Sequence, residues 1–304
     1  MFLNVGVATL CRILLNTSRR FVYPFAPAIS RGLDVPLTSV TSLIAVNQMT
    51  GLLGPLFGPL GDRIGYRIML IAGLGLLAGG MLTGGFFPFY GMILVALLMA
   101  GLGKCIFDPA ILAYAGKRVP YNRRGLVIGI METAWAGSTL VGIPLVGILM
   151  ERFGWRVPFF VMGVFALVGM VAIAWVMPPS QKELSGFPET GRLRDIIRSY
   201  RGKRPVLGIL LFAFFVAMAN DNFFVIYGAW LEESFKLGIV TLGMVTMIIG
   251  VAELAGEMLV AFVSDHLGLR RSVILGIFLS AVSYLIVPYW ASTVPRAMTA
   301  IFCV

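Results

Sequence analysis

Long, unbroken runs of apolar residues restrict the fold of this sequence more than any other feature. A helix needs roughly 20 apolar residues to cross a hydrocarbon core of about 30 Å, whereas barrel strands would read as weakly alternating segments of about ten. Since 59% of the residues are hydrophobic and 12% are charged, a water-soluble globule is excluded. We therefore expect an all-α polytopic membrane protein with helices near residues 3–28, 38–61, 68–86, 89–114, 126–150, 157–177, 205–230, 239–263 and 270–290, and a tenth that begins near Pro295 and is unfinished at Val304.

The distribution of basic residues among the loops explains the net charge of +10. Cytoplasmic loops of membrane proteins are rich in Lys and Arg. Most of the loop Lys and Arg follow the second, fourth, sixth and eighth runs. This bias predicts a multi-pass protein of the plasma (inner) membrane, with the lipid bilayer around it and a cytoplasmic amino terminus. The basicity then reflects topology, and no nucleic acid partner is expected.

One long polar segment divides the chain. It predicts an amino-terminal six-helix transmembrane bundle (1–177), a cytoplasmic linker (178–204) and an incomplete carboxyl-terminal transmembrane bundle (205–304). Within the linker, apolar residues at helical spacing alternate with arginines, which is typical of a short helix on an anionic membrane surface. A solvated linker with chance periodicity is the other interpretation.

Two charged turns show internal repetition. "GPLGDRIGYR" (58–67) follows the second run, and "SDHLGLRR" (264–271) follows the eighth. Setting Asp265 on Asp62 aligns Gly268 with Gly65 and Arg270 with Arg67. Because these turns must join two helices in few residues, we expect Gly58, Gly61 and Gly65 to allow close backbone approach. Parallel repeats of this kind are a common transporter architecture.

These residues resemble the major facilitator superfamily of secondary transporters. The first turn matches the signature loop of that family, and "GSTLVGIPLVG" (137–147) is similar to its fifth-helix glycine-proline motif. The resemblance implies parallel six-helix repeats, the second incomplete because the eleventh and twelfth helices are missing, as in a chain truncated in its tenth helix. It also implies that the turns act in gating, the alternative being an ordinary interfacial turn; the implied residues are Gly58, Gly61, Asp62, Arg63, Gly65, Arg67, Asp265 and Arg270.

Ionisable residues inside the runs are the strongest indication of function, since each costs roughly 2.5 to 3.5 kcal/mol at the centre of a bilayer unless it is paired or faces water. Spacings of four, three and four place Arg12, Asn16, Arg19 and Tyr23 on one helical face. Lys104 and Asp108 are one turn apart and form either a local ion pair or part of the same cavity. With Asp221 and Asn222, these residues are the predicted substrate cavity, on runs that the resemblance implies are pore-lining.

The three glutamates inside the runs have different predicted roles. Glu253 and Glu257 are one turn apart on the eighth run, and their repulsion favours a proton on one of them. Glu253 and Asp221 are the predicted proton-coupling residues, while Glu257 is close enough to the inner surface to be solvated. Glu132, near the start of the fifth run, is expected to be an interfacial partner of the basic loop before it.

The sequence offers no motif for an enzyme, a cofactor or a metal. "AGLGKC" lacks the hydroxyl that would hold magnesium in a nucleotide-binding loop, and the chain has 1 histidine. We expect a secondary active transporter of a small organic solute that works by alternating access, with proton-coupled efflux as the favoured mode. The alternatives are a proton-independent facilitator or importer, and a non-transporting remnant or scaffold that needs a second chain.

Overall fold

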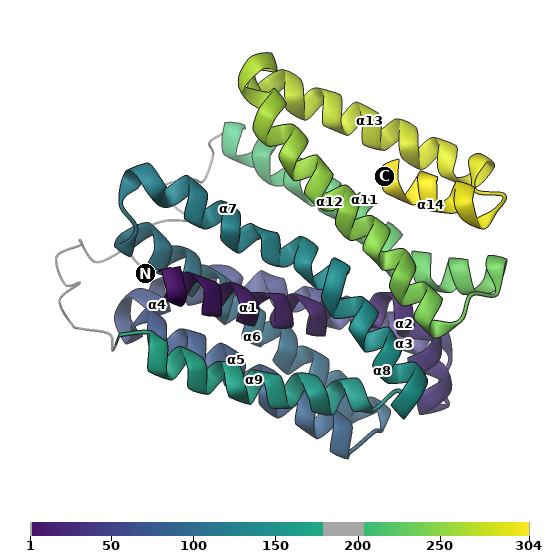
Figure 1. Ribbon diagram of the computed structural model, residues 1–304, viewed down its shortest axis with the longest axis horizontal. Coiled ribbons are helices and arrows are strands. Elements are labelled where there is room, and N and C mark those ends of the chain that lie inside the picture. The colour runs from purple at the N-terminus through teal and green to yellow at the C-terminus, as the bar shows by residue number, and fades with distance from the viewer. Residues whose placement is uncertain (1, 179–203, 304) are drawn as a thin grey trace.

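The structure, a computed structural model, describes residues 2–178 and 204–303, and every regular element in these ranges is helical (Figure 1). The predicted linker helix lies outside the described residues. The helices are α1 (Phe2–Arg20), α2 (Val22–Leu33), α3 (Leu37–Met49), the 3₁₀ turn η1 (Thr50–Leu53), α4 (Gly54–Ile64), α5 (Tyr66–Phe86), α6 (Tyr90–Arg118), α7 (Tyr121–Gly137), the π turn η2 (Ser138–Gly142), α8 (Ile143–Phe153), α9 (Val157–Val176), α11 (Arg204–Phe235), α12 (Ile239–Leu267), α13 (Leu269–Trp290) and α14 (Val294–Cys303).

The first apolar run forms two helices with a break at Phe21, and not the continuous span expected. Pro24 has no N–H to donate to the carbonyl of Arg20, four residues earlier, which interrupts the helical ladder at this point. Elsewhere in the described chain, 8 helices are long and apolar enough to cross a membrane. The prediction of an all-α polytopic membrane protein is confirmed.

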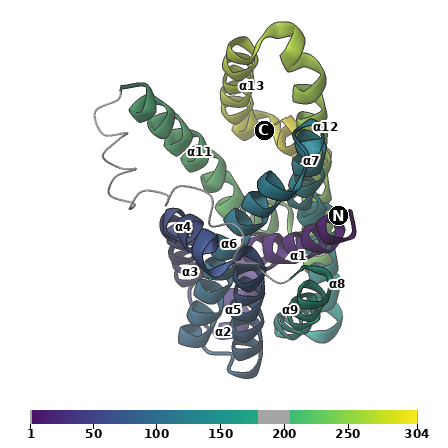
Figure 2. The same ribbon diagram turned by 90° about the vertical axis from the view of Figure 1, so that its left-hand side faces the viewer.

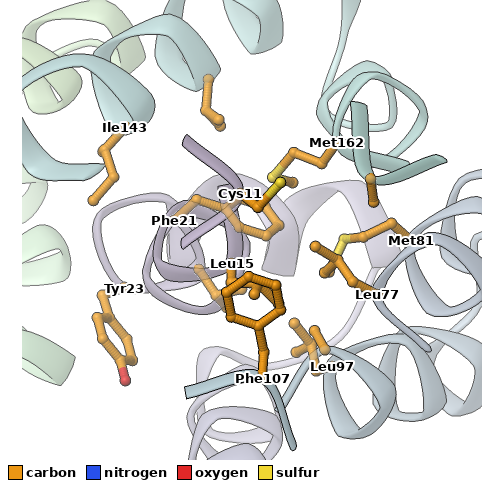
Figure 3. Close-up of a cluster of buried hydrophobic side chains, with 14 of the residues drawn as sticks. Cys11, Leu15, Phe21, Tyr23, Leu77, Met81, Leu97, Phe107, Ile143 and Met162 are labelled. Carbon is orange, nitrogen blue, oxygen red and sulfur yellow. The ribbon is translucent and has the colours of Figure 1, made fainter. Parts of the chain in front are cut away.

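The amino-terminal half packs around one face of α1. Val5, Ala8, Cys11 and Leu15 recur at spacings of three and four residues, and all are buried. Figure 3 shows Cys11 and Leu15 among apolar side chains from α5, α6 and α9. The polar residues Arg12 and Asn16 lie beside this stripe and are buried too, whereas Leu3 and Leu10 on the opposite face of α1 are exposed.

The two halves meet at one end of the molecule. There α11 packs against α2, and α12 packs against α8 and η2. Glycines permit this approach: a Cβ at Gly228 of α11 would lie 2.6 Å from Pro24 Cα, and one at Gly250 of α12 would lie 2.6 Å from Leu140 Cγ. The motif at 137–147 therefore lies at the contact between the halves.

At the opposite end the halves stand apart. Figure 2 shows the start of α11 well separated from α4 and α7. A Cβ added at Gly125 on α7 or at Gly208 on α11 would meet no described atom within 4 Å, and the side chains from Leu207 to Phe215 are exposed. The halves are thus closed at the α2–α8 end and open at the end that carries the linker.

The repeated turns have the same backbone geometry. Gly65, between α4 and α5, has φ 100° and ψ 140°, and Gly268, between α12 and α13, has φ 82° and ψ 139°. The alignment of these two residues is confirmed. The prediction of close backbone approach, however, is wrong for Gly58 and Gly61. A Cβ added at Gly58 meets no described atom within 4 Å, and one added at Gly61 meets the Tyr66 side chain, at 3.5 Å, and no backbone atom.

Alanine at either repeated glycine is expected to lower the free energy of unfolding by about 1 to 3 kcal/mol, since a Cβ is strained at these backbone angles. Gly58→Ala is the matched control on the same turn. Gly58 lies in a helix with open space around it, so alanine there should be neutral or stabilise by up to about 1 kcal/mol. Unfolding of detergent-solubilised protein measures all three, and equal losses at Gly58 and Gly65 would contradict this explanation.

Candidate functional site

A cluster of four charges joins α1, α6 and α7. Lys104 Nζ donates to Asp108 Oδ2 and to Asn16 Oδ1, both at 2.5 Å. Asp108 also accepts a hydrogen bond from Arg12 Nε at 3.2 Å. The Arg12 guanidinium reaches Glu132 with two hydrogen bonds, at 2.8 Å and 3.2 Å. We call Arg12, Lys104, Asp108 and Glu132 the charge cluster.

The charge cluster is formally neutral, which is why the membrane interior tolerates it. Arg12 is 7% exposed and Lys104 is 6% exposed, and a buried charge without a partner costs several kcal/mol. The two cations and two carboxylates form three ion pairs, and Asp108 lies between both cations. Of the two interpretations of Lys104 and Asp108, the ion pair is present, and it is part of a larger network.

A second group of polar residues joins α1 to α11 through α3. Arg19 donates to Asn47 Oδ1 at 3.3 Å and to the side-chain oxygen of Gln48. The Gln48 amide nitrogen in turn donates to Tyr23 Oη at 2.8 Å and to Asp221 Oδ2 at 3.1 Å. We call Arg19, Gln48 and Asp221 the amide bridge, because one neutral amide separates a cation from a carboxylate.

A third contact is a buried ion pair between the halves. Arg20 of α1 lies 2.8 Å from Glu253 Oε1 of α12. Trp135 Nε1 donates to the same carboxylate at 3.0 Å, and Thr139 Oγ1 donates to its other oxygen at 2.8 Å. The guanidinium also lies over the rings of Trp135 and Phe224, at 4.4 Å and 4.9 Å. Both charges are therefore fully engaged in this conformation.

The remaining predicted cavity residue, Asn222, lies apart from these groups. It is exposed, and its amide donates to Met218 O of the preceding turn at 2.7 Å. It borders an apolar groove of about 260 Å³ between α11 and α13, lined also by Phe223, Ile226, Tyr227, Trp230, Tyr284 and Val287. Glu257 is exposed as well.

The sequence interpretation of Glu132 as an interfacial residue is wrong. α7 begins at Tyr121, earlier than the expected start near 126, so Glu132 lies well inside the helix and pairs with Arg12. Sequence reasoning also missed Gln48, Trp135 and Thr139. These side chains carry no charge, so a search for ionisable residues does not find them, although amide, hydroxyl and indole N–H groups inside a span also need hydrogen-bond partners.

The predicted gating residues are described only in part. The side chains of Asp62, Arg63 and Asp265 lie outside the described residues. Arg67 donates to the carbonyl of Ala174 at the end of α9, and Arg270 is exposed. In the described part of the chain, no three His, Cys, Asp or Glu side chains gather as a metal site.

A helical membrane protein with two halves, repeated turns and buried charges between them has the features of a transporter. A family model described as Major Facilitator Superfamily matches residues 8–304. The chain belongs to this superfamily.

Several curated relatives share about a quarter of its residues. An uncharacterized MFS-type transporter YceJ of Bacillus subtilis is 25% identical over 77% of this chain and 59% of its own length. A multi-drug resistance efflux pump PmrA homolog of Lactococcus lactis is 24% identical, covering 93% of this chain and 71% of the relative. The multidrug resistance protein MdtG of Citrobacter koseri is 25% identical, covering 91% and 70%. The chain thus spans about three fifths to seven tenths of the length of these relatives.

Solved structures agree on the fold. A bacterial homolog of the human lysosomal transporter Spinster, in an inward-facing and unoccupied conformation, has a TM-score of 0.75 at 14% identity and covers 99% of this chain and 71% of its own. A D-xylose-proton symporter has a TM-score of 0.72 at 16% identity, covering 99% and 78%. At these identities the likeness extends to the fold alone.

Proposed function

We propose that this protein exports a small organic solute across the plasma (inner) membrane by alternating access, in exchange for protons. The observation that carries the proposal is the buried Arg20–Glu253 ion pair, which joins the two halves at 2.8 Å beside their glycine-lined contact. Relatives named as multidrug efflux proteins favour export as the direction. With the cytoplasmic amino terminus inferred from the basic loops, the open end would face the cytoplasm and admit solute from there.

The ion pair supplies a way for a proton to change the conformation. When Glu253 is ionised, its attraction to Arg20 holds α12 against α1 and η2, and the α2–α8 end is closed. When Glu253 takes up a proton, that attraction falls to an ordinary hydrogen bond. The closed end can then part while the linker end closes, which is the exchange that alternating access requires. Asp221, at the same contact between the halves, is the second candidate proton carrier.

Spin-label distances across the open end test this proposal without knowledge of the solute. Cysteines at Gly125 and Gly208, in a background without the native cysteines, carry labels at positions with open space. We expect the population of short distances to grow as pH falls, because protonated Glu253 favours closure of this end. Glu253→Gln mimics the protonated state and should give the low-pH distribution at every pH.

Arg31→Gln is the control for that experiment. Arg31 pairs with Glu232 across the same contact, but its side chain is 60% exposed, so the pH response should persist in this variant. A wild-type distance distribution that is identical from acid to alkaline pH would overturn the proposed coupling.

A further inference from the structure

Arg19 and Asp221 are opposite charges at the contact between the halves that do not pair with each other. Arg12, Lys104 and Arg20 each have a carboxylate within the 4.0 Å ion-pair distance. Among the described residues, Arg19 and Asp221 have none; each instead contacts one end of the Gln48 amide. A half-buried guanidinium and a half-buried carboxylate therefore face neutral partners where charged ones would bind more strongly.

The length of the amide bridge matches a small zwitterion. Typical hydrogen-bond lengths on either side of one amide put the guanidinium and carboxylate about 6 to 8 Å apart. In a ligand with an ammonium and a carboxylate on the same carbon, and one hydrogen bond from each group to the protein, the two protein charges lie about the same distance apart. Such a ligand can replace Gln48, with its carboxylate on Arg19 and its ammonium on Asp221.

The surroundings of Asp221 favour an ammonium with an apolar body. The Tyr23 and Phe224 rings lie 6.5 Å apart at this contact, and Tyr23 Oη shares the Gln48 amide with Asp221. Aromatic faces attract cations in sites from which water is excluded, and the Phe224 ring already has the Arg20 guanidinium over it. Arg19 and Gln48 come from the amino-terminal half and Asp221 from the other, so one bound ligand would join both halves.

We propose that Arg19 and Asp221 form a recognition site for a zwitterionic solute that carries an ammonium and a carboxylate on the same carbon. This inference rests on the proposed transport function and names its substrate class. A lone cation would leave Arg19 unpaired, and a lone anion would leave Asp221 unpaired. The site therefore selects against solutes with a single charge, because each leaves one protein charge without a partner.

Three ligands with the same phenyl ring test the site: L-phenylalanine (zwitterion), phenethylamine (cation) and 3-phenylpropionate (anion). Binding to the purified full chain in detergent is measured calorimetrically. We expect L-phenylalanine to bind at least about tenfold more tightly than either of the others, a difference of about 1.4 kcal/mol. Equal binding of phenethylamine and L-phenylalanine, or binding of none of the three, would overturn the proposal.

Two variants separate the roles of the charges. Arg19→Gln should abolish the preference for L-phenylalanine over phenethylamine, and Asp221→Asn should abolish its preference over 3-phenylpropionate. A variant that loses affinity for all three ligands equally, with an unchanged melting temperature, contradicts the assignment. Arg31→Gln, on the exposed ion pair, should leave all three affinities unchanged.

Failure of this inference can be told from failure of the proposed function. The spin-label response to pH depends on Glu253 and needs no ligand. If labels respond to pH but zwitterions show no preference, the substrate class is wrong and proton coupling stands. If L-phenylalanine binds with the expected preference while the labels do not respond, the site stands and proton coupling is wrong.

Discussion

Replacing Arg20 with glutamine is expected to lower the free energy of unfolding by about 3 kcal/mol or more, since loss of one partner from a buried ion pair typically costs about 3 to 5 kcal/mol. Glu253 would keep its hydrogen bonds from Trp135 and Thr139 but lose its counter-charge. The change is measured by thermal unfolding in detergent. Arg31→Gln removes a second ion pair between the halves, and because that side chain is 60% exposed the change should cost less than about 1 kcal/mol.

The double variant Arg20→Gln with Glu253→Gln tests whether the loss of stability comes from the ion pair. Two amides of similar shape can hydrogen-bond without an unpaired charge, so the pair should recover much of the stability that the single variant loses. If the double variant is as unstable as the sum of the two single changes, the ion pair is not the source of the effect.

Replacing Asp108 with leucine is the second change with a large expected effect, a loss of about 3 to 5 kcal/mol. Asp108 contacts both cations of the charge cluster, and Arg12 retains Glu132 after the change. Lys104, which is 6% exposed, would keep only its contact with Asn16 and the ring of Trp135. Thermal unfolding of the detergent-solubilised variant measures the loss.

The apolar double variant Lys104→Met with Asp108→Leu should restore most of that stability, because replacing both members of a buried ion pair with apolar residues is often neutral or stabilising. A double variant less stable than Asp108→Leu would show that Lys104 contributes through packing and not through its charge.

Helical spacing and charge were sufficient to find one side of the candidate site. The polar face of α1 could be predicted because residues three and four apart share a face whatever their surroundings. The repeated turns could be predicted because Asp, Gly and Arg recur at the same spacing in both, and the positive φ at Gly65 and Gly268 explains why glycine recurs. Both features are local, so the sequence alone contains them.

Contacts between distant helices could not be predicted in the same way. Nothing in the spacing of α3 indicates that Gln48 lies between Arg19 and Asp221, because that depends on how three helices pack. The pairing of Glu253 with Arg20 likewise depends on how the two halves pack against each other. The prediction for Glu132 was wrong because the start of α7 was placed too late in the sequence. Apolarity alone locates this start poorly, since Tyr121 and Arg123 lie in the first turn of the helix.

The π turn at Ser138–Gly142 divides the fifth span into two helices, α7 and α8, whose contact faces point in different directions. Its hydrogen bonds enclose one residue more than an α turn, which rotates α8 by about 100° relative to the register of α7. Glu132 before the turn faces Arg12, while Gly147 after it packs on Phe25 and the start of α12. The fifth span therefore contacts the charge cluster before the turn and packs against the opposite half after it. Because the turn changes the helical register, the residues that make these two contacts need not lie on one continuous helical face.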